Sequence, residues 1–89
     1  MINIRKTSKY NRQRDEFIKH NIKAGKALVK TLKLFRENPN HPSLNLEKLR
    51  GSDYWTIRID QGSRIFFMWI DSETALFMDI GKHDKYREY

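Results

Sequence analysis

The stretch Tyr54-Trp-Thr-Ile-Arg-Ile-Asp-Gln-Gly-Ser-Arg-Ile-Phe-Phe-Met-Trp-Ile70 decides the fold that we predict for this chain. Its first part, residues 54–60, alternates between apolar and polar side chains, which is the pattern of a half-buried strand. One face of that strand holds Trp55, Ile57 and Ile59. Gln61-Gly62 is typical of a two-residue hairpin turn. Residues 63–70 are apolar on both faces apart from Arg64, so we expect the central strand of a sheet that is covered on each side.

Two helices are predicted before this hairpin. The first begins near Ser8, the expected N-cap, and ends near Asn21. The second runs from Ile22 to Glu37 and is amphipathic. Its apolar stripe consists of Ala24, Ala27, Leu28, Leu32 and Phe35, and its basic stripe of Lys23, Lys26, Lys30 and Lys33. Asn38-Pro-Asn-His-Pro42 ends the second helix, because proline cannot continue it.

Further strands are expected at residues 2–6 and 74–80, and the turn Asp71-Ser-Glu73 precedes the latter. Leu44, Leu46 and Leu49 indicate an ordered loop or short strand at the sheet edge. The prediction is a single α+β domain over residues 1–89, with two N-terminal helices on one face of a small, mainly antiparallel, three- to four-stranded twisted sheet. The other face would hold Tyr54, Arg58, Arg64, Phe66 and Met68, and we expect a ligand or partner to cover it.

The chain is strongly basic, with a formal net charge of +7 over 89 residues. Residues 1–38 contain 11 Lys and Arg against 3 Asp and Glu, whereas residues 39–89 contain 7 against 8. The helical half should therefore attract phosphate backbones, acidic proteins or anionic membranes, unless its lysines form an ordinary solvated helix face. No cysteine is present and no apolar run approaches the roughly 20 residues of a membrane helix. We expect a soluble cytoplasmic protein without disulfides, thiolate metal sites or membrane contact.

Two arginines are expected close together on the hairpin. Arg58 and Arg64 lie three and two positions from its turn, and neighbouring strand residues on one face are about 5 to 8 Å apart. Two guanidinium groups in one patch repel each other unless an anion lies between them, and a phosphate fits their geometry. The alternative is that each pairs with a nearby carboxylate such as Asp60 or Asp79.

The last residues, Gly81-Lys-His-Asp-Lys-Tyr-Arg-Glu-Tyr89, add a histidine, basic residues and two tyrosines. An unperturbed pKa near 6.5 makes His83 a candidate proton donor, although a lone surface histidine often has no chemical role. The two tyrosines could stack on a base or cover the core. A set of further side chains could contact RNA or be ordinary surface: Lys48, Arg50, Lys82, Lys85 and Tyr89. The histidines are too scattered for a metal site, and no phosphate loop or nucleophile motif predicts a cofactor.

The order of these segments resembles the RelE/ParE superfamily of bacterial toxins over nearly the whole chain, above all its plasmid-stabilisation and YafQ/YoeB-like members. The resemblance rests on two basic helices followed by His41-Pro-Ser-Leu44, Leu46-Glu-Lys-Leu-Arg-Gly51, Tyr54-Trp-Thr-Ile-Arg-Ile59, Ser63-Arg-Ile-Phe-Phe67 and Asp79-Ile-Gly-Lys-His-Asp-Lys-Tyr86. It implies a ribosome-associated endoribonuclease that cuts messenger RNA without a metal or other cofactor, through attack of a ribose 2'-hydroxyl on the adjacent phosphate. It also implies a cognate antitoxin as partner.

The resemblance assigns roles to four residues. Arg64 matches the arginine that binds the scissile phosphate and Arg58 a basic residue of the same cluster. His83 matches the position of the general acid, and Tyr86 or Tyr89 the C-terminal tyrosine. Where RelE has a strand lysine two residues before the Arg58 position, this chain has Thr56, which favours a histidine-centred mechanism. The alternatives are a ParE-like inhibitor of DNA gyrase that cleaves nothing and an inactive RNA-binding relative.

Overall fold

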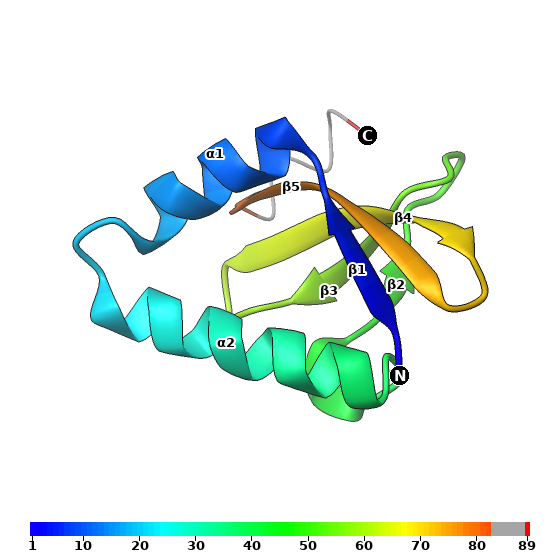
Figure 1. Ribbon diagram of the computed structural model, residues 1–89, viewed down its shortest axis with the longest axis horizontal. Helices are drawn as coiled ribbons and strands as arrows, with labels where there is room; N and C mark the ends of the chain where they lie inside the picture. Colours follow the sequence, from blue (N-terminus) through cyan, green and yellow to red (C-terminus); the bar gives the residue numbers. More distant parts are fainter. Residues whose placement is uncertain (83–88) are drawn as a thin grey trace.

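The computed structural model describes residues 1–82 and residue 89. It consists of a helical hairpin packed on one face of a five-stranded sheet (Figure 1). The elements in chain order are β1 (Asn3–Lys6), α1 (Ser8–Ile18), α2 (Ile22–Glu37), a 3-10 turn η1 (Pro42–Leu44), β2 (Glu47–Lys48), β3 (Trp55–Arg58), β4 (Ser63–Asp71) and β5 (Thr74–Lys82). The strand order is β1-β5-β4-β3-β2, and only the β1–β5 pairing among these strands is parallel. The α+β prediction is confirmed, with β4 central and with five strands instead of three to four.

The core lies between the helices and the sheet. Aromatic rings from four elements meet there: Phe35 of α2 lies 5.2 Å from Phe67 of β4 and 5.6 Å from Phe77 of β5, centroid to centroid, and Tyr10 of α1 lies 5.3 Å from Phe77. All four side chains are fully buried. Leu28 from the predicted stripe of α2 joins the same cluster, and the four lysines of the opposite stripe are exposed. The alternation read from the hairpin and the helix therefore selects the side of each element that becomes the core.

Both helices begin with a side-chain cap. Thr7, and not the predicted Ser8, is the N-cap of α1: its Oγ1 accepts a hydrogen bond from the Tyr10 N–H at 3.1 Å. The same hydroxyl lies 3.0 Å from the carbonyl oxygen of Phe77, to which it donates. The prediction was wrong by one residue because this bond to β5 favours Thr7. Asn21 caps α2, with Oδ1 accepting from the Ala24 N–H at 3.0 Å.

The hairpin loop between β3 and β4 is longer than predicted. The Ile59 N–H donates to the Ser63 carbonyl, so three residues, 60–62, form the loop instead of Gln61-Gly62 alone. The Asp60 side chain braces it by accepting from the Gly62 N–H at 3.0 Å. The last strand is also longer than the predicted residues 74–80, since β5 continues to Lys82.

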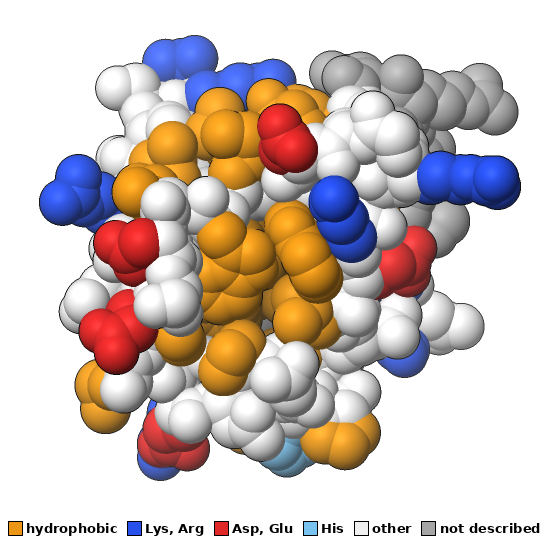
Figure 2. All heavy atoms as spheres, turned by 90° about the vertical axis from the view of Figure 1, so that its right-hand side faces the viewer, with side chains coloured by type: hydrophobic (Ala, Val, Ile, Leu, Met, Phe, Trp, Pro, Cys, Tyr) orange, Lys and Arg blue, Asp and Glu red, His pale blue; other side chains and the backbone are white. Residues whose placement is uncertain are grey.

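The sheet face away from the helices is open only in part: Arg58 is exposed, and Tyr54 and Met68 are half-buried. Arg64 is 8% exposed and Phe66 is fully buried, contrary to the expectation that a ligand or partner covers them. The chain's own last residue does part of this, because the Tyr89 ring stacks on Phe66 with centroids 5.0 Å apart. Figure 2 shows a different part of the surface, the right-hand side of Figure 1, where hydrophobic side chains gather at the centre with charged side chains around them.

Candidate nucleic-acid interface

The arginine pair of the β3–β4 hairpin forms the centre of the candidate site. The register places Arg58 directly opposite Arg64, so the pairing predicted from the sequence is confirmed. Arg58 is exposed and Arg64 is buried. The two guanidinium groups thus start from adjacent backbone positions on one face of the sheet, where their mutual repulsion disfavours a site without an anion.

Among the described residues, Arg64 is held from the side of the β3–β4 loop. Its Nη1 donates to the carbonyl oxygens of Asp60 and Ser63, each at 3.0 Å. Its Nε is buried and has no hydrogen-bond partner within residues 1–82 and 89. Buried N–H groups without an acceptor are costly, and those of a charged group more so. The guanidinium is therefore fixed in direction while part of its hydrogen-bonding capacity remains unused.

Neither carboxylate that could have neutralised the arginines does so among the described residues. Asp60 approaches Arg64 through its backbone carbonyl, and its carboxylate accepts from Gly62. Asp79 forms its ion pair with Lys9, at 3.4 Å. The alternative that Arg58 and Arg64 form ion pairs with these two acids is wrong for the described part of the chain, and the pair keeps its positive charge.

The other basic candidates divide into two groups. Lys82 ends β5 opposite Ser63, one residue along the register from Arg64, and it is exposed at the same end of the sheet. Lys48 pairs with Trp55, three residues before Arg58 on β3, which is about 10 Å along a strand. Lys48 and Arg50 therefore lie toward the other end of β3, and the structure does not bring them to the arginine pair.

A cluster that sequence reasoning missed lies beside the arginine pair on the same face. Asp79 is opposite Phe66 in the register and is fully buried. Its Oδ2 accepts a 2.8 Å hydrogen bond from the Tyr89 hydroxyl, and that hydroxyl accepts one of 2.9 Å from Lys9 Nζ. Asp79 was considered only as a partner for arginine, and Lys9 only as part of the general basic charge. A single aspartate in an otherwise apolar strand was the signal that could have led to the cluster.

Protonation in this cluster is set by burial and by the short hydrogen bonds. Burial raises the pKa of the Tyr89 hydroxyl; the hydrogen bond from Lys9 opposes this and the one to Asp79 adds to it. The hydrogen bond to Tyr89, followed by the charge of Asp79, raises the pKa of Lys9, against a lowering by burial. Tyr89 is therefore a neutral phenol and Lys9 an ammonium group at neutral pH.

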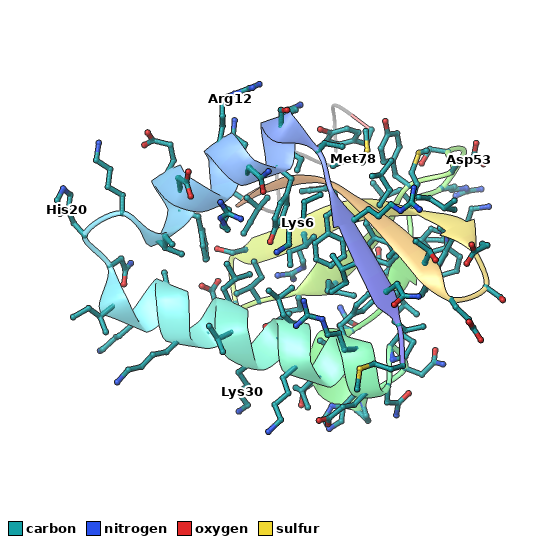
Figure 3. All side chains as sticks on the ribbon, in the orientation of Figure 1. Lys6, Arg12, His20, Lys30, Asp53 and Met78 are labelled. Carbon is teal, nitrogen blue, oxygen red and sulfur yellow. The ribbon has the colours of Figure 1, made fainter. Side chains whose placement is uncertain are left out.

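Several predicted residues lie outside the described part of the chain. His83, Tyr86 and Lys85 belong to residues 83–88, so their predicted roles stay predictions. The other two histidines lie in connecting segments. His20 lies between α1 and α2 and points outward (Figure 3), and His41 Nδ1 accepts a hydrogen bond from the Ser43 N–H. Within residues 1–82 and 89, no group of three or more His, Cys, Asp or Glu could hold a metal ion.

A groove lies between the two helices in the described part of the chain. It has a volume of about 710 Å³ and an apolar floor that includes Ile18, Val29 and Leu32. Val29 is 68% exposed, which is high for a large aliphatic side chain. Arg14, Lys26, Lys30 and Lys33 line the groove with positive charge. Figure 3 shows Lys30 pointing away from the sheet. No helix in the described part of the chain is long and apolar enough to cross a membrane.

Comparison with known proteins gives a likeness to solved structures. No protein-family model and no curated protein matches the chain. The YoeB/ParE toxin from Agrobacterium tumefaciens matches 92% of this chain and 99% of its own, with a TM-score of 0.75 and 13% identity. A YoeB-YefM complex from Staphylococcus aureus matches with a TM-score of 0.72 and 21% identity, over 93% of this chain and 98% of that chain. YafQ from Escherichia coli matches with a TM-score of 0.73 and 12% identity, over 94% and 96%.

These matches cover nearly all of both chains in each pair, so they concern the whole architecture and not one motif. The sequence identities are too low to assign a function from these matches. The matched structures nevertheless agree with the order of helices and strands described above. The chain therefore has the fold of these YoeB/ParE and YafQ toxins, and the resemblance seen in its sequence is confirmed at the level of the fold.

Proposed function

We propose that this protein is the toxin of a bacterial type II toxin-antitoxin pair and acts as an endoribonuclease on messenger RNA at the ribosome. The observation that carries the proposal is the arginine pair: Arg64 is buried with an unused Nε–H, and Arg58 lies directly opposite it without a carboxylate partner among the described residues. A phosphate supplies the acceptors and the negative charge that this pair lacks.

The chemistry needs no bound cofactor. The ribose 2'-hydroxyl gives its proton to solvent water as its oxygen attacks the adjacent phosphorus, the 2'-oxygen to phosphorus bond forms, and the phosphorus to 5'-oxygen bond breaks. The products are a 2',3'-cyclic phosphate and a free 5'-hydroxyl. Arg64 and Arg58 stabilise the charge that develops on the phosphate oxygens. His83 donates the proton to the leaving 5'-oxygen and Tyr86 assists, as the family resemblance implies.

The remaining cations would position the RNA. Lys82, at the end of β5, contacts neighbouring phosphates, the same role remains predicted for Lys85, and the exposed lysines of α2 draw the protein to ribosomal RNA. Thr56 cannot supply the positive charge that RelE places near this position. It is fully buried in this chain. The arginine pair and His83 therefore carry more of the catalysis, and the cytoplasm, where ribosomes are, is the place of action.

The partner that fits this surface is an acidic, amphipathic segment of a cognate antitoxin. One structural neighbour is a complex of YoeB with YefM. In this chain the sheet face already holds Tyr89 on Phe66, whereas the α1–α2 groove exposes Val29 between basic side chains. Apolar side chains of the antitoxin would occupy the groove floor, and its carboxylates would pair with Lys26 and Lys33. A second copy of this chain would bring like charges together there.

Controlled expression in bacteria tests the function. Growth arrest with new 5' ends inside messenger RNA, mapped during translation, is the expected result. Arrest with intact messenger RNA and inhibited DNA supercoiling would show a ParE-like gyrase inhibitor instead. No arrest, with folded protein present, would show an inactive relative. Loss of arrest in both Arg64→Ala and His83→Ala would connect the activity to the proposed site.

A further inference from the structure

A fully buried carboxylate on the sheet face has no part in the phosphate chemistry proposed above. Asp79 sits in β5 directly opposite Phe66, with Arg64 diagonally across on the same face, and burying such a charge is costly unless it is well paired. Its Oδ1 accepts from the Ile80 N–H at 2.8 Å. Its Oδ2 accepts from the Tyr89 hydroxyl at 2.8 Å and lies 3.4 Å from Lys9 Nζ. The carboxylate is thus directed at the last residue of the sequence.

The direction of each hydrogen bond in this cluster is fixed by chemistry. An ammonium group only donates and a carboxylate only accepts, so the hydroxyl of Tyr89 must accept from Lys9 and donate to Asp79. Both bonds involve a charged partner, which makes each stronger than a neutral one. The phenol is therefore held by two oriented bonds, one from α1 and one from β5.

Aromatic contacts hold the same ring from its faces and edges. Tyr89 stacks on Phe66 at 5.0 Å with an interplanar angle of 28°, and its centroid lies 4.5 Å from that of Tyr54. Phe66 itself is fully buried. Tyr89 is thus fixed at its oxygen and at its ring, with α1, β4 and β5 all taking part.

We propose that Lys9 and Asp79 are positioning residues that pin Tyr89 to the sheet, so that the chain is fixed on both sides of residues 83–88. Lys82 is the other fixed point, because it pairs with Ser63 at the end of β5. His83 follows Lys82 directly in the sequence. Arg64 is the residue next to Ser63, the partner of Lys82 in β4. The proton transfer predicted for His83 would then depend on the pin, and this consequence rests on the proposed function.

The same contacts define what Tyr89 does not do. Burial and the bond to Asp79 raise the pKa of Tyr89, so the phenol keeps its proton at neutral pH and is poorly suited to act as a general base. The hydroxyl that is already donating to a buried carboxylate is an anchor.

NMR of the 89-residue chain tests the pin directly. The ring protons of Tyr89, assigned with Tyr89→Phe, should be shifted by the rings of Phe66 and Tyr54. In Lys9→Met and Asp79→Asn these shifts should move to the values of an unstructured tyrosine, and Lys9→Arg should restore them. Lys19→Met, an exposed lysine at the end of α1, is the matched control. Unchanged Tyr89 shifts in a folded Lys9→Met would overturn the proposal, and because Lys9 is exposed this variant does not depend on tolerating a change at buried Asp79.

Cleavage kinetics test the positioning role. Lys9→Met should lower kcat by about 10- to 100-fold with KM nearly unchanged, because a displaced catalytic group slows chemistry more than binding. Lys9→Arg should recover the rate. A freed Tyr89 with full kcat would overturn the positioning role. If the parent protein cleaves no RNA, the proposed function fails, and the NMR shifts alone decide whether the pin exists.

Discussion

Replacement of Arg64 by methionine separates a phosphate-binding arginine from a structural one. In the free protein, the side chain loses two hydrogen bonds from Nη1, but their acceptors are loop carbonyls and Asp60 is exposed, so water can replace the donor. At the same time a buried charge with an unsatisfied Nε–H disappears. Apolar replacement of a buried ion of similar size is often neutral, so we expect the free energy of unfolding to change by about 1 kcal/mol or less.

The effect on cleavage should be much larger. A charged hydrogen bond is worth about 1.5 to 3 kcal/mol, and its loss from the transition state slows the reaction by about 10- to 150-fold. Arg64→Lys keeps the charge but loses the planar fork, so it should fall between methionine and the parent. Arg12→Met is the matched control, because Arg12 is exposed on α1 and points away from the body of the protein (Figure 3).

The assay is cleavage of one defined messenger RNA in a translating extract, followed by primer extension, with thermal unfolding measured on the same samples. Arg64→Met that stays folded and cleaves within about twofold of Arg12→Met would refute the phosphate role. Strong destabilisation with normal cleavage per folded molecule would instead assign Arg64 to bracing the loop of residues 60–62.

Three further predictions concern stability, pH and partner binding. Thr7→Val should lower the free energy of unfolding by about 2 kcal/mol, and the melting temperature by about 8 to 16 °C in calorimetry, because it removes the α1 cap and the bond to Phe77, whereas Thr7→Ser should stay near the parent. Burial raises the pKa of Tyr10 to about 12, so the free energy of unfolding should fall as the pH rises from 10 toward 12. Tyr10→Phe removes a buried hydroxyl that has no partner among the described residues, so its stability at pH 7 should match or exceed that of the parent. In denaturant titrations the variant should also lose less stability between pH 10 and 12. Val29→Asp should weaken antitoxin binding at least tenfold in calorimetric titration, because it places a negative charge in the groove that repels the carboxylates of the acidic antitoxin. Ile70→Asp, at another exposed aliphatic residue, should not weaken binding.

The helices and strands could be predicted because buried apolar residues recur in the sequence with the period of each element. Range 22–37 was predicted without error, since the stripe that contains Leu28 and Phe35 alternates with lysines at every turn. The central strand followed from an apolar run that only Arg64 interrupts. The α1 cap was misplaced because of a single hydrogen bond to a distant residue, from Thr7 to Phe77 of β5.

The site could be predicted only in part, for the same reason. Arg58 and Arg64 are close in sequence, so a hairpin was enough to place them opposite each other. Lys9 and Asp79 are 70 positions apart, and no local pattern joins them. Their contact depends on the packing of α1 against β5 and on where Tyr89 lies, which hydrophobic periodicity does not encode.

The two faces of the sheet differ in what the fold requires of their residues. A RelE/ParE fold needs the helix-facing side of β4 and β5 to be apolar, and Phe67 and Phe77 meet that need. Nothing in that packing requires an arginine at position 64 or a carboxylate at position 79 on the opposite side. Apolar residues there would cover the face with less desolvation cost. Charges at such positions point to a role beyond folding, and we propose that the two clusters divide it: the arginine pair would receive the phosphate, and Asp79 with Lys9 would fix Tyr89, six residues after the predicted proton donor.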